Sequence, residues 1–577
     1  MQRRIVRRDC PDLSGWDSSI PPLLQRIYAA RGVKDAAQLD YSLRSLVPPS
    51  RLQGVERAAE LLQEAIDAQQ SILILGDFDA DGATSTAVAM LGLQMLGAGK
   101  LAFRVPSRFA DGYGLSAGII DRLREEGALP DVLVTVDNGI SAVEGVAAAR
   151  EAGCRVIVTD HHLPGEQLPA ADAIVNPNQP GCEFLSKHAA GVGVMFYVLT
   201  VLRRRLRDVG RFEQGREPNL AELLDLVALG TVADVVPLDH NNRILVAQGL
   251  RRIRQGQTRP GIKALLEVAG RKLDSLTSTD LGFVIGPRLN AAGRLDDMSL
   301  GIACLLADRE DAAMELAVEL DRLNRERRSI EQEMRLQAEE NLQQLHLSGK
   351  NLPWGLCLYE PEWHQGVIGI LAARVREQVH RPVIAFAAAD EDEQEIKGSA
   401  RSIPGVHIRD VLARVDARQP GLLLKYGGHA MAAGMTLKRA DFDRFAKAFD
   451  EAVREYASED DLQATIHTDG ELTEAELNLA TARVLQKAGP WGQHFPEPQF
   501  DGPFEIINQR IVGERHLKLL LRPPQGEVLV DAIAFNVDTR VWPNHRCERV
   551  HLAYKLDVNE FRGRESVQLK VDYLEPL

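Results

Sequence analysis

Three aspartates stand at alternate positions in the turn GDFDADG. Asp77, Asp79 and Asp81 directly follow the apolar run Ile72–Leu75, which has the pattern of a buried strand, and precede a stretch of good helix formers. Three carboxylates this close repel one another, and a divalent cation would hold them together. The alternative is a polar turn whose aspartates cap the helix. An EF-hand loop is excluded, because Val88 stands where the bidentate glutamate belongs.

Two later strand patterns, at 131–136 and 155–159, also end in side chains that bind cations. They are Asp137 after the first strand, and Asp160, His161 and His162 after the second. Strand and helix alternate at the interval of βαβ units, which predicts a parallel sheet covered by helices. Parallel strands end at one edge of the sheet, so these side chains should converge. Capping explains any one of them, but three coincident strand ends favour a common site.

Asp234 is a fourth candidate, within the apolar stretch TVADVVPL. Burial of an unpaired carboxylate is costly, so this residue needs a partner. A helix cap is again the alternative, and the metal interpretation is favoured only beside the other three sites.

Several glycine-rich motifs carry side chains that suit phosphate. Glycine and alanine leave backbone N–H groups accessible, and arginine grips phosphate bidentately. The alternative is a set of close-packed turns. The candidates, in SRFADGYG, GPRLNAAGR, GSARS and GGHAMAAG, are Arg108, Tyr113, Arg288, Asn290, Arg294, Ser399, Arg401, Gly428 and His429.

Length and composition set limits on the class of protein. A chain of 577 residues predicts three or four domains, and its net charge of −14 means that any nucleic-acid contact uses a local basic cleft. The six cysteines show no CxxC spacing, which is typical of a reducing compartment. We find neither a secretory signal pattern nor an 18-residue apolar run, so the sequence predicts a cytoplasmic protein without a membrane span.

Two segments of the second half have distinct patterns. Residues 302–348 contain neither Gly nor Pro, and a helix over 308–345 would be about 55 Å long, so we predict a rigid connector with a charged, solvated middle, RERRSIEQEMR. Residues 504–577 contain five or six strand patterns, which predict a small antiparallel barrel of the OB-fold type. Its aromatic residues Trp542, Tyr554 and Phe561 either stack on bases or fill the core.

In their order along the chain, GDFDADG, SRFADGYG, VTVDNGIS, Asp160-His161-His162, GTVADVVPL and GPRLNAAGR resemble the motifs of the DHH phosphoesterase superfamily. With GSARS and GGHAMAAG, the chain is similar to the single-strand-specific 5′→3′ exonucleases of that superfamily, over about 72–434. The resemblance implies an α/β fold with a parallel-sheet catalytic domain. It also implies this division: an N-terminal extension (1–55), a DHH catalytic domain (56–305), a connector helix (306–348), a DHHA1 substrate-binding domain (349–458) and an OB-fold nucleic-acid-binding domain (459–577).

The resemblance also implies roles for the candidate residues. Two Mn²⁺ or Mg²⁺ ions would be held by Asp79, Asp81, Asp137, His161 and Asp234, with Asp137 bridging and Asp77 in or near the same shell. Related pyrophosphatases carry a metal-binding histidine where this chain has Leu75, a departure from that branch. His162 would face the scissile phosphate. The strand or its 5′ end would be held by Arg288, Asn290, Arg294, Ser399, Arg401, Gly428 and His429, with Arg108 and Tyr113 as further candidates.

The function implied is metal-dependent hydrolysis of single-stranded DNA from its 5′ end to 5′-mononucleotides, in DNA repair and recombination. The expected partners are single-stranded-DNA-binding protein and a helicase, and the expected state is a monomer. One alternative is a phosphodiesterase for small nucleotides or oligonucleotides, which would not need the connector and barrel. Another is a non-catalytic scaffold, but every expected ligand is present.

Overall fold

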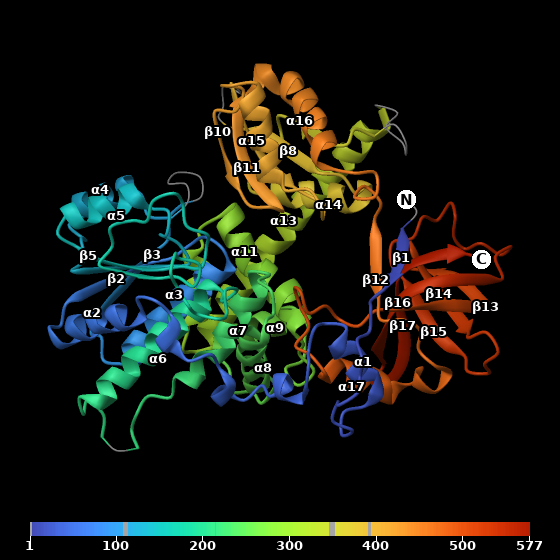
Figure 1. Ribbon diagram of the computed structural model, residues 1–577, viewed down its shortest axis with the longest axis horizontal. Coiled ribbons are helices and arrows are strands. Elements are labelled where there is room, and N and C mark those ends of the chain that lie inside the picture. Colours follow the sequence, from blue (N-terminus) through green and yellow to red (C-terminus); the bar gives the residue numbers. More distant parts are fainter. Residues whose placement is uncertain (1–2, 108–113, 214, 345–351, 390–393) are drawn as a thin grey trace.

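The computed structural model describes residues 3–107, 114–213, 215–344, 352–389 and 394–577 (Figure 1). Its first unit is a five-stranded, fully parallel sheet. The strand order is β3 (Lys100–Arg104), β2 (Ser71–Leu75), β4 (Val132–Val136), β5 (Arg155–Thr159) and β6 (Ala173–Val175). The predicted parallel sheet is therefore confirmed.

Helices cover both faces of this sheet. Successive strand residues point to opposite faces, so Ile72 and Ile74 pack in one core and Leu73 and Leu75 in another. The first core includes α2 (Val55–Asp67), α3 (Ala80–Met95) and α6 (Gly191–Asp208), and the second includes α4 (Ala117–Glu125) and α5 (Val143–Glu151). Burial on both faces explains why these strands are continuous apolar runs.

A helical region follows the sheet and ends in the predicted long helix. Its elements are α7 (Leu224–Ala233), α8 (His240–Arg254), α9 (Pro260–Val268), α10 (Ser278–Asp280), the π-helix η5 (Leu281–Ile285), α11 (Gly286–Leu295) and α12 (Ser299–Leu306). The long helix, α13 (Glu310–Gln344), has 35 residues and spans about 52 Å. It packs against α9 and α11 near its start and then against α14 (Ile368–Val379) of the next domain (Figure 1).

The second α/β domain contains a mixed sheet in the order β10-β11-β9-β8-β7. Its strands are β7 (Leu356–Tyr359), β8 (Val383–Ala388), β9 (Glu395–Arg401), β10 (Lys425–Gly428) and β11 (Ala432–Lys438). Within the described residues, β7 and β8 are parallel, and the other neighbours are antiparallel. Helices α14, α15 (Ile408–Arg418) and α16 (Phe442–Tyr456) complete the domain.

The C-terminal part is a closed five-stranded barrel, as predicted. Its order is β13 (Phe500–Val512), β14 (His516–Arg522), β15 (Val530–Ala534), β17 (Arg564–Pro576) and β16 (Arg549–Phe561). The pair β15–β17 is parallel, in contrast to the predicted antiparallel barrel, because five strands cannot alternate in direction all the way round a closed ring. Trp542 and Tyr554 are buried in its core, whereas Phe561 is exposed at the β16–β17 turn.

The N-terminal segment joins the barrel side of the molecule. Strand β1 (Arg4–Arg7) pairs in parallel with β12 (Thr465–Thr468), so the two lie side by side in Figure 1. Arg7 is paired with Asp501, 2.8 Å away. Among the described residues, we find no helix with the length and apolar character that a membrane crossing needs.

Candidate metal centre

Two carboxylates of the acidic turn after β2 are held by different contacts. Asp79 caps α3, accepting a hydrogen bond from the Gly82 N–H, so the capping interpretation is correct for this residue. Asp81 lies in the first turn of α3, fully buried. It accepts hydrogen bonds from the N–H groups of Gly191 and Val192, at the start of α6 (2.7 and 3.0 Å). The turn is thereby tied to a second helix N-terminus.

Asp137 lies at the carboxyl end of β4 in a strained backbone conformation, with φ of 61°. Gly191 packs directly against it: a Cβ on Gly191 would meet the Asp137 carboxylate oxygen at 2.6 Å. The next residue, Asn138, donates from Nδ2 to the carbonyls of Leu75 and Gly76. These contacts fix the end of β4 against the end of β2 and leave room for the Asp137 carboxylate only because residue 191 is glycine.

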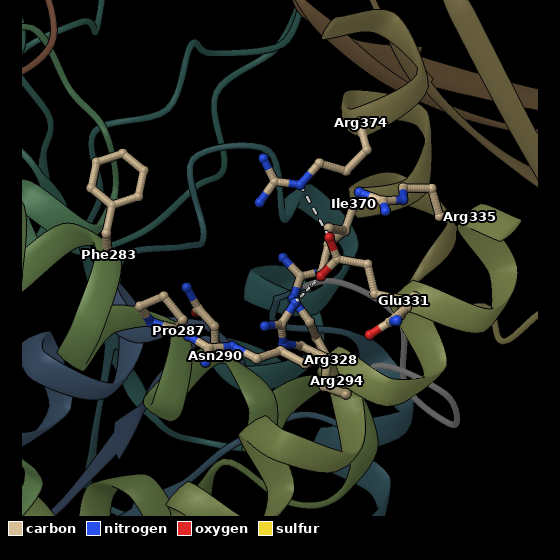
Figure 2. A pocket seen from close by; sticks show the side chains of 11 residues that line it. Phe283, Pro287, Asn290, Arg294, Arg328, Glu331, Arg335, Ile370 and Arg374 are labelled. Carbon is tan, nitrogen blue, oxygen red and sulfur yellow. Dashed lines mark hydrogen bonds and ion pairs between the residues drawn. The ribbon is translucent and has the colours of Figure 1, made fainter. Parts of the chain in front are cut away.

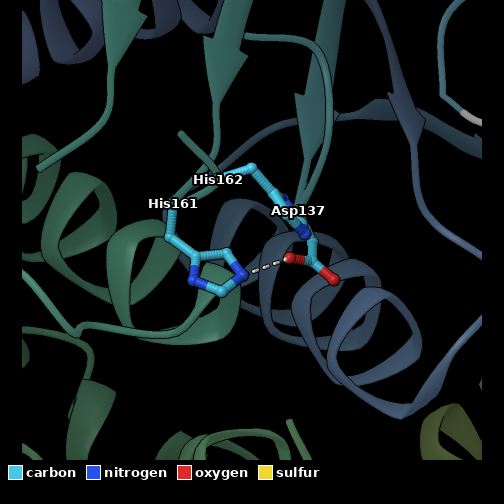
Figure 3. A group of neighbouring side chains, drawn as sticks. All are labelled: Asp137, His161 and His162. Atoms are coloured by element: carbon cyan, nitrogen blue, oxygen red, sulfur yellow. Dashed lines mark ion pairs between the residues drawn. The ribbon is translucent and has the colours of Figure 1, made fainter. Parts of the chain in front are cut away.

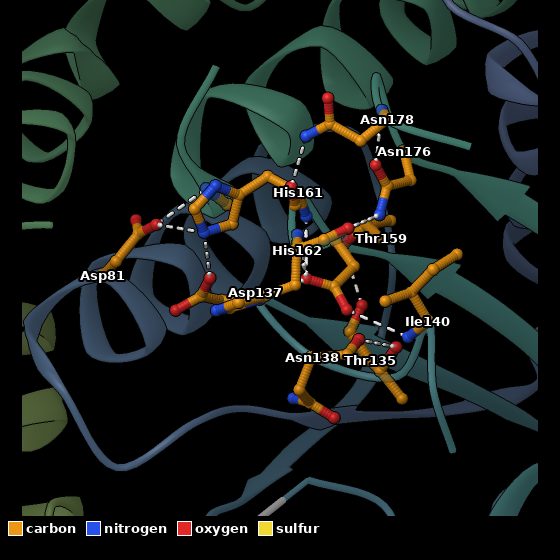
Figure 4. Close-up of polar contacts among 12 residues, drawn as sticks. Asp81, Thr135, Asp137, Asn138, Ile140, Thr159, His161, His162, Asn176 and Asn178 are labelled. Atoms are coloured by element: carbon orange, nitrogen blue, oxygen red, sulfur yellow. Dashed lines mark hydrogen bonds and ion pairs between the residues drawn. The ribbon is translucent and has the colours of Figure 1, made fainter. Parts of the chain in front are cut away.

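His161 brings the strand ends and α7 together. Its Nε2 lies 3.1 Å from Asp137 Oδ1 (Figure 3) and 3.9 Å from Asp81 Oδ2 (Figure 4). The same nitrogen lies 3.4 Å from Asp234 Oδ2. Asp234 comes from the C-terminal end of α7, and the following Val235 has φ of 61°, which is rare for a β-branched residue. The predicted convergence of Asp81, Asp137, His161 and Asp234 is therefore observed.

The adjacent histidine has a different partner. His162 Nδ1 lies 2.8 Å from Asp160 Oδ1, and the other carboxylate oxygen of Asp160 accepts a hydrogen bond from the Ile140 N–H. The His161 and His162 rings are 4.5 Å apart, centroid to centroid, at an angle of 56°. Asp160 thus orients His162, while His161 faces the carboxylate cluster.

Seven side chains around this centre form three overlapping sets that could hold metal ions. Within each set the donor atoms lie within 4.8 Å of one another. The sets, found among the described residues, are Asp77–Asp79–Asp137, Asp81–His161–Asp234 and Asp137–His161–His162. Hard carboxylate ligands that outnumber imidazole suit Mn²⁺ or Mg²⁺. Asp137 and His161 each belong to two sets, as expected for neighbouring cation positions.

The charges of the cluster are poorly compensated by the protein itself. Burial and the nearby Asp79 raise the pKa of Asp81 to about 7. Burial and then repulsion from Asp81 raise the pKa values of Asp137 and Asp234 well above the usual range. Burial lowers the pKa of His161 to about 3, so this imidazole is neutral and adds no positive charge. A buried group of repelling carboxylates is the environment that a divalent cation stabilises.

His162 differs from His161 in its protonation. Burial alone would lower the pKa of His162, but its hydrogen bond to Asp160 raises it to about 9. Asp160 is buried as well, which would raise its pKa, yet the contact with His162 keeps that pKa below its usual value. The two neighbouring imidazoles therefore differ in charge, His161 being neutral and His162 positive.

The three residues of α11 that were predicted to hold the strand have different surroundings. Asn290 Oδ1 accepts a hydrogen bond from the Ala80 N–H (2.8 Å), which supports the acidic turn. Arg294 donates to the carbonyl of Gly366, linking α11 to the second α/β domain. Arg288 is buried and pairs with Asp321 of α13 at 2.8 Å. Arg108 and Tyr113 lie outside the described residues.

The second α/β domain holds another group of candidates. Arg401 donates to Ser399 Oγ (3.1 Å), and a Cβ on Gly369, at the start of α14, would meet the guanidinium at 2.8 Å. Within the described part of the chain, no carboxylate lies within ion-pair distance of Arg401, and burial lowers its pKa. Partial desolvation and then the charge of His162 lower the pKa of His429, an exposed residue next to Gly428.

The comparisons with known proteins agree with this architecture. Three family models match: "DHH family, N-terminal domain" at 71–231, "DHHA1 domain" at 354–455 and "RecJ OB domain" at 468–573. The single-stranded-DNA-specific exonuclease RecJ of Escherichia coli (strain K12) is 54% identical over 578 residues, covering 100% of both chains. This chain belongs to the RecJ family.

Solved RecJ structures match over the whole chain. The crystal structure of RecJ in complex with Mn²⁺ from Thermus thermophilus has a TM-score of 0.80 and 30% identity, covering 100% of this chain and 79% of that one. The Mg²⁺ complex from the same organism gives a TM-score of 0.75 and 29% identity, covering 100% and 78%. The fold predicted from sequence, with DHH, DHHA1 and OB domains, is thus confirmed.

One structural feature of this RecJ family member was not predicted from its sequence. A cleft of about 500 Å³ lies where α11, α13 and α14 meet (Figure 2). Its basic lining residues are Arg294, Arg327, Arg328, Arg335 and Arg374, and Glu331 adds an acidic group. We call it the arginine cleft. The charged middle of α13 was expected to be a solvated surface, and part of it instead lines this cleft, because α14 packs beside it.

Proposed function

We propose that this chain is a metal-dependent exonuclease that degrades single-stranded DNA in the 5′→3′ direction and releases 5′-mononucleotides. The observation that carries the proposal is the convergence of Asp81, Asp137, His161 and Asp234, from four separate elements, around one small volume. Family membership and the likeness to RecJ structures with Mn²⁺ and Mg²⁺ support it.

The donor sets suggest how two cations would be shared. Asp77 and Asp79 would hold one ion, Asp81 and Asp234 the other, and Asp137 would bridge them, with His161 as the nitrogen ligand of the second ion. When bound, such a pair neutralises charge on the phosphate and lowers the pKa of the attacking water. The protein supplies the positions, through the hydrogen bonds that fix the acidic turn and the strained backbone at Asp137.

His162 is the residue that we assign to the scissile phosphate. Asp160 accepts a hydrogen bond from the Nδ1–H group and keeps the imidazole charged at neutral pH. The Nε2–H group then donates to a phosphate oxygen and stabilises the negative charge that develops there.

A pocket for the terminal phosphate would explain the 5′ polarity. Arg401 and Ser399 are paired with each other rather than with an acid, and Gly369, because it has no side chain, lets both approach the backbone at the start of α14 closely. A guanidinium, a hydroxyl and a helix N-terminus are suitable ligands for a phosphate dianion. Gly428 and His429, from the β10–β11 turn, would close this pocket toward the metal centre.

The arginine cleft would hold the rest of the strand. Five guanidinium groups line it, and although Arg327 and Arg374 pair with Glu331, the cleft has a local excess of positive charge. Arg294 would contact the backbone phosphates directly. Asn290 and Arg288 would act by holding the acidic turn and α13 in place, through their contacts with Ala80 and Asp321. Arg108 and Tyr113 stay predicted strand contacts.

Further predictions rest on the family resemblance. They are the division into five parts at 1–55, 56–305, 306–348, 349–458 and 459–577, the cooperation with single-stranded-DNA-binding protein and a helicase, the monomeric state and the cytoplasmic location. Each is a proposal for this chain.

The decisive experiment is a digest of one strand carrying a label at either the 5′ or the 3′ end. With Mn²⁺ or Mg²⁺, a 5′ label should appear at once as mononucleotide, whereas a 3′ label should stay in shortening strands, and a chelator should stop both. Blunt duplex of the same sequence is the control and should resist. Hydrolysis of dinucleotides with no action on long strands would refute the proposal in favour of a small-nucleotide phosphodiesterase.

A further inference from the structure

Phe283 is an aromatic side chain that the proposed function does not yet use. It is 74% exposed, although its neighbours Leu281 and Ile285 are fully buried. All three belong to the π-helix η5. A single turn of π-helix inserts an extra residue and changes the direction of side chains, and such π-bulges are frequent at functional sites. Here the result is a large apolar ring that faces solvent.

The backbone that carries this ring is fixed against the metal centre. A Cβ on Gly282 would meet a methyl carbon of Val232 at 3.1 Å, and a Cβ on Gly286 would meet the Cβ of Ala233 at 3.2 Å. Val232 and Ala233 are the last residues of α7, directly before Asp234. Phe283 is therefore held at a defined position relative to a proposed metal ligand.

Phe283 lines two neighbouring pockets. The ring lines the arginine cleft, where it stands apart from Arg335 and Arg374, on the far side of the opening in Figure 2. It also lines a second hollow of about 290 Å³, which is mainly apolar and includes Val235 and Trp491. One wall of the passage is thus basic and the other apolar. A single strand has the matching arrangement, with phosphates along one side and the faces of unpaired bases on the other.

We propose that Phe283 stacks on a base of the single strand while the arginine cleft holds its phosphates. This inference rests on the proposed function and adds a specificity residue to it. Stacking on a ring needs a base with a free face, which every unpaired base offers and a base inside a duplex does not. The contact therefore tolerates any sequence and favours single strands.

The test uses a series of 5′-phosphorylated single strands, each with one abasic site at a different position. For each strand, kcat/KM for nucleotide release by the full-length protein is measured with Mn²⁺. In the wild type, an abasic site at one position should lower kcat/KM on the order of tenfold. Phe283→Ala should lower kcat/KM on the intact strand by the same factor and show no further loss at that position. Phe283→Trp should behave like the wild type. Leu185→Ala, at a residue 71% exposed, is the matched control and should change nothing.

The results separate this inference from the function on which it rests. Stacking by Phe283 is refuted, and the exonuclease assignment stands, if the wild type digests the strand and Phe283→Ala is equally fast. The same holds if the loss of kcat/KM from the abasic site and the loss from Phe283→Ala multiply at every position of the abasic site. If the wild type releases no nucleotide, both fail.

Discussion

Replacing Asp234 by asparagine should make the metal-free protein more stable while it removes activity. The donor atoms of Asp81 and Asp234 lie within 4.8 Å of each other. Two ionised carboxylates at that separation repel by about 3 kcal/mol at an effective dielectric constant of about 20. The amide that D234N introduces carries no charge and keeps the shape of the side chain. The free energy of unfolding without metal should therefore rise by up to about 3 kcal/mol.

The rise in the free energy of unfolding that we expect for metal-free D234N should depend on pH. The pKa of Asp81 is raised to about 7 in the folded protein, and burial and then Asp81 raise the pKa of Asp234 well above its usual value. A raised carboxyl pKa stabilises the folded state below the unfolded value, and this contribution is lost as the pH rises through the folded value. The wild type should thus lose stability as the pH rises from about 4 through the Asp81 pKa of about 7, and D234N should gain little at about pH 5 and more at about pH 8.

The assay is urea unfolding at about pH 5 and about pH 8, with chelator or with Mn²⁺. Mn²⁺ should stabilise the wild type strongly and D234N weakly, since a ligand stabilises only the state that binds it. Asp501→Asn is the matched control, at a buried carboxylate outside the metal centre. Asp501 pairs with Arg7 and accepts a hydrogen bond from Thr468 Oγ1, and these contacts lower its pKa, so its amide variant should be less stable with or without metal.

Two results would refute this reasoning. One is a D234N protein that is less stable than the wild type in chelator at about pH 8, as expected for the control. The other is an equal gain from Mn²⁺ in D234N and in the wild type. Either would mean that the carboxylates do not form a repelling group that awaits a cation.

Three further predictions concern other parts of the site. Gly191→Ala places a methyl group against Asp137 and should reduce kcat about 100-fold and weaken Mn²⁺ binding by calorimetry; unchanged values would show that the close contact has no role. Arg401→Lys should lower kcat/KM on the order of tenfold for a 5′-phosphorylated strand and much less for a 5′-hydroxyl strand, and an equal loss on both would argue against a terminal-phosphate pocket. Asp160→Asn should move the pKa of His162, followed by NMR in the metal-free protein, from about 9 toward its usual value near 6.5, so that activity declines at lower pH than in the wild type; an unmoved titration would contradict the pairing.

The sequence predicted those parts of the site that follow local rules. Buried strand patterns with polar ends gave the edge of the sheet, and the alternation of strand and helix gave its parallel order. Convergence of Asp81, Asp137 and His161 followed from these two facts. The position of Asp234 was harder to derive, because it comes from the end of a helix rather than of a strand.

Other features depend on packing between distant segments and leave no local signal. The tight contact of Gly191 with Asp137 involves two residues 54 positions apart in sequence. The arginines of α13 have the spacing of an exposed helix face, and only the packing of α14 against α13 converts part of that face into a cleft. Phe283 has no distinguishing local signal either, because one aromatic residue in a helical pattern is usually part of the core.

The most direct test of the account is the number and place of metal ions in crystals grown with Mn²⁺, measured by anomalous diffraction at the manganese edge. The account predicts two ions that share Asp137, one beside Asp77 and Asp79 and the other beside Asp81, His161 and Asp234. A single ion, or manganese at a site without Asp137, would contradict it.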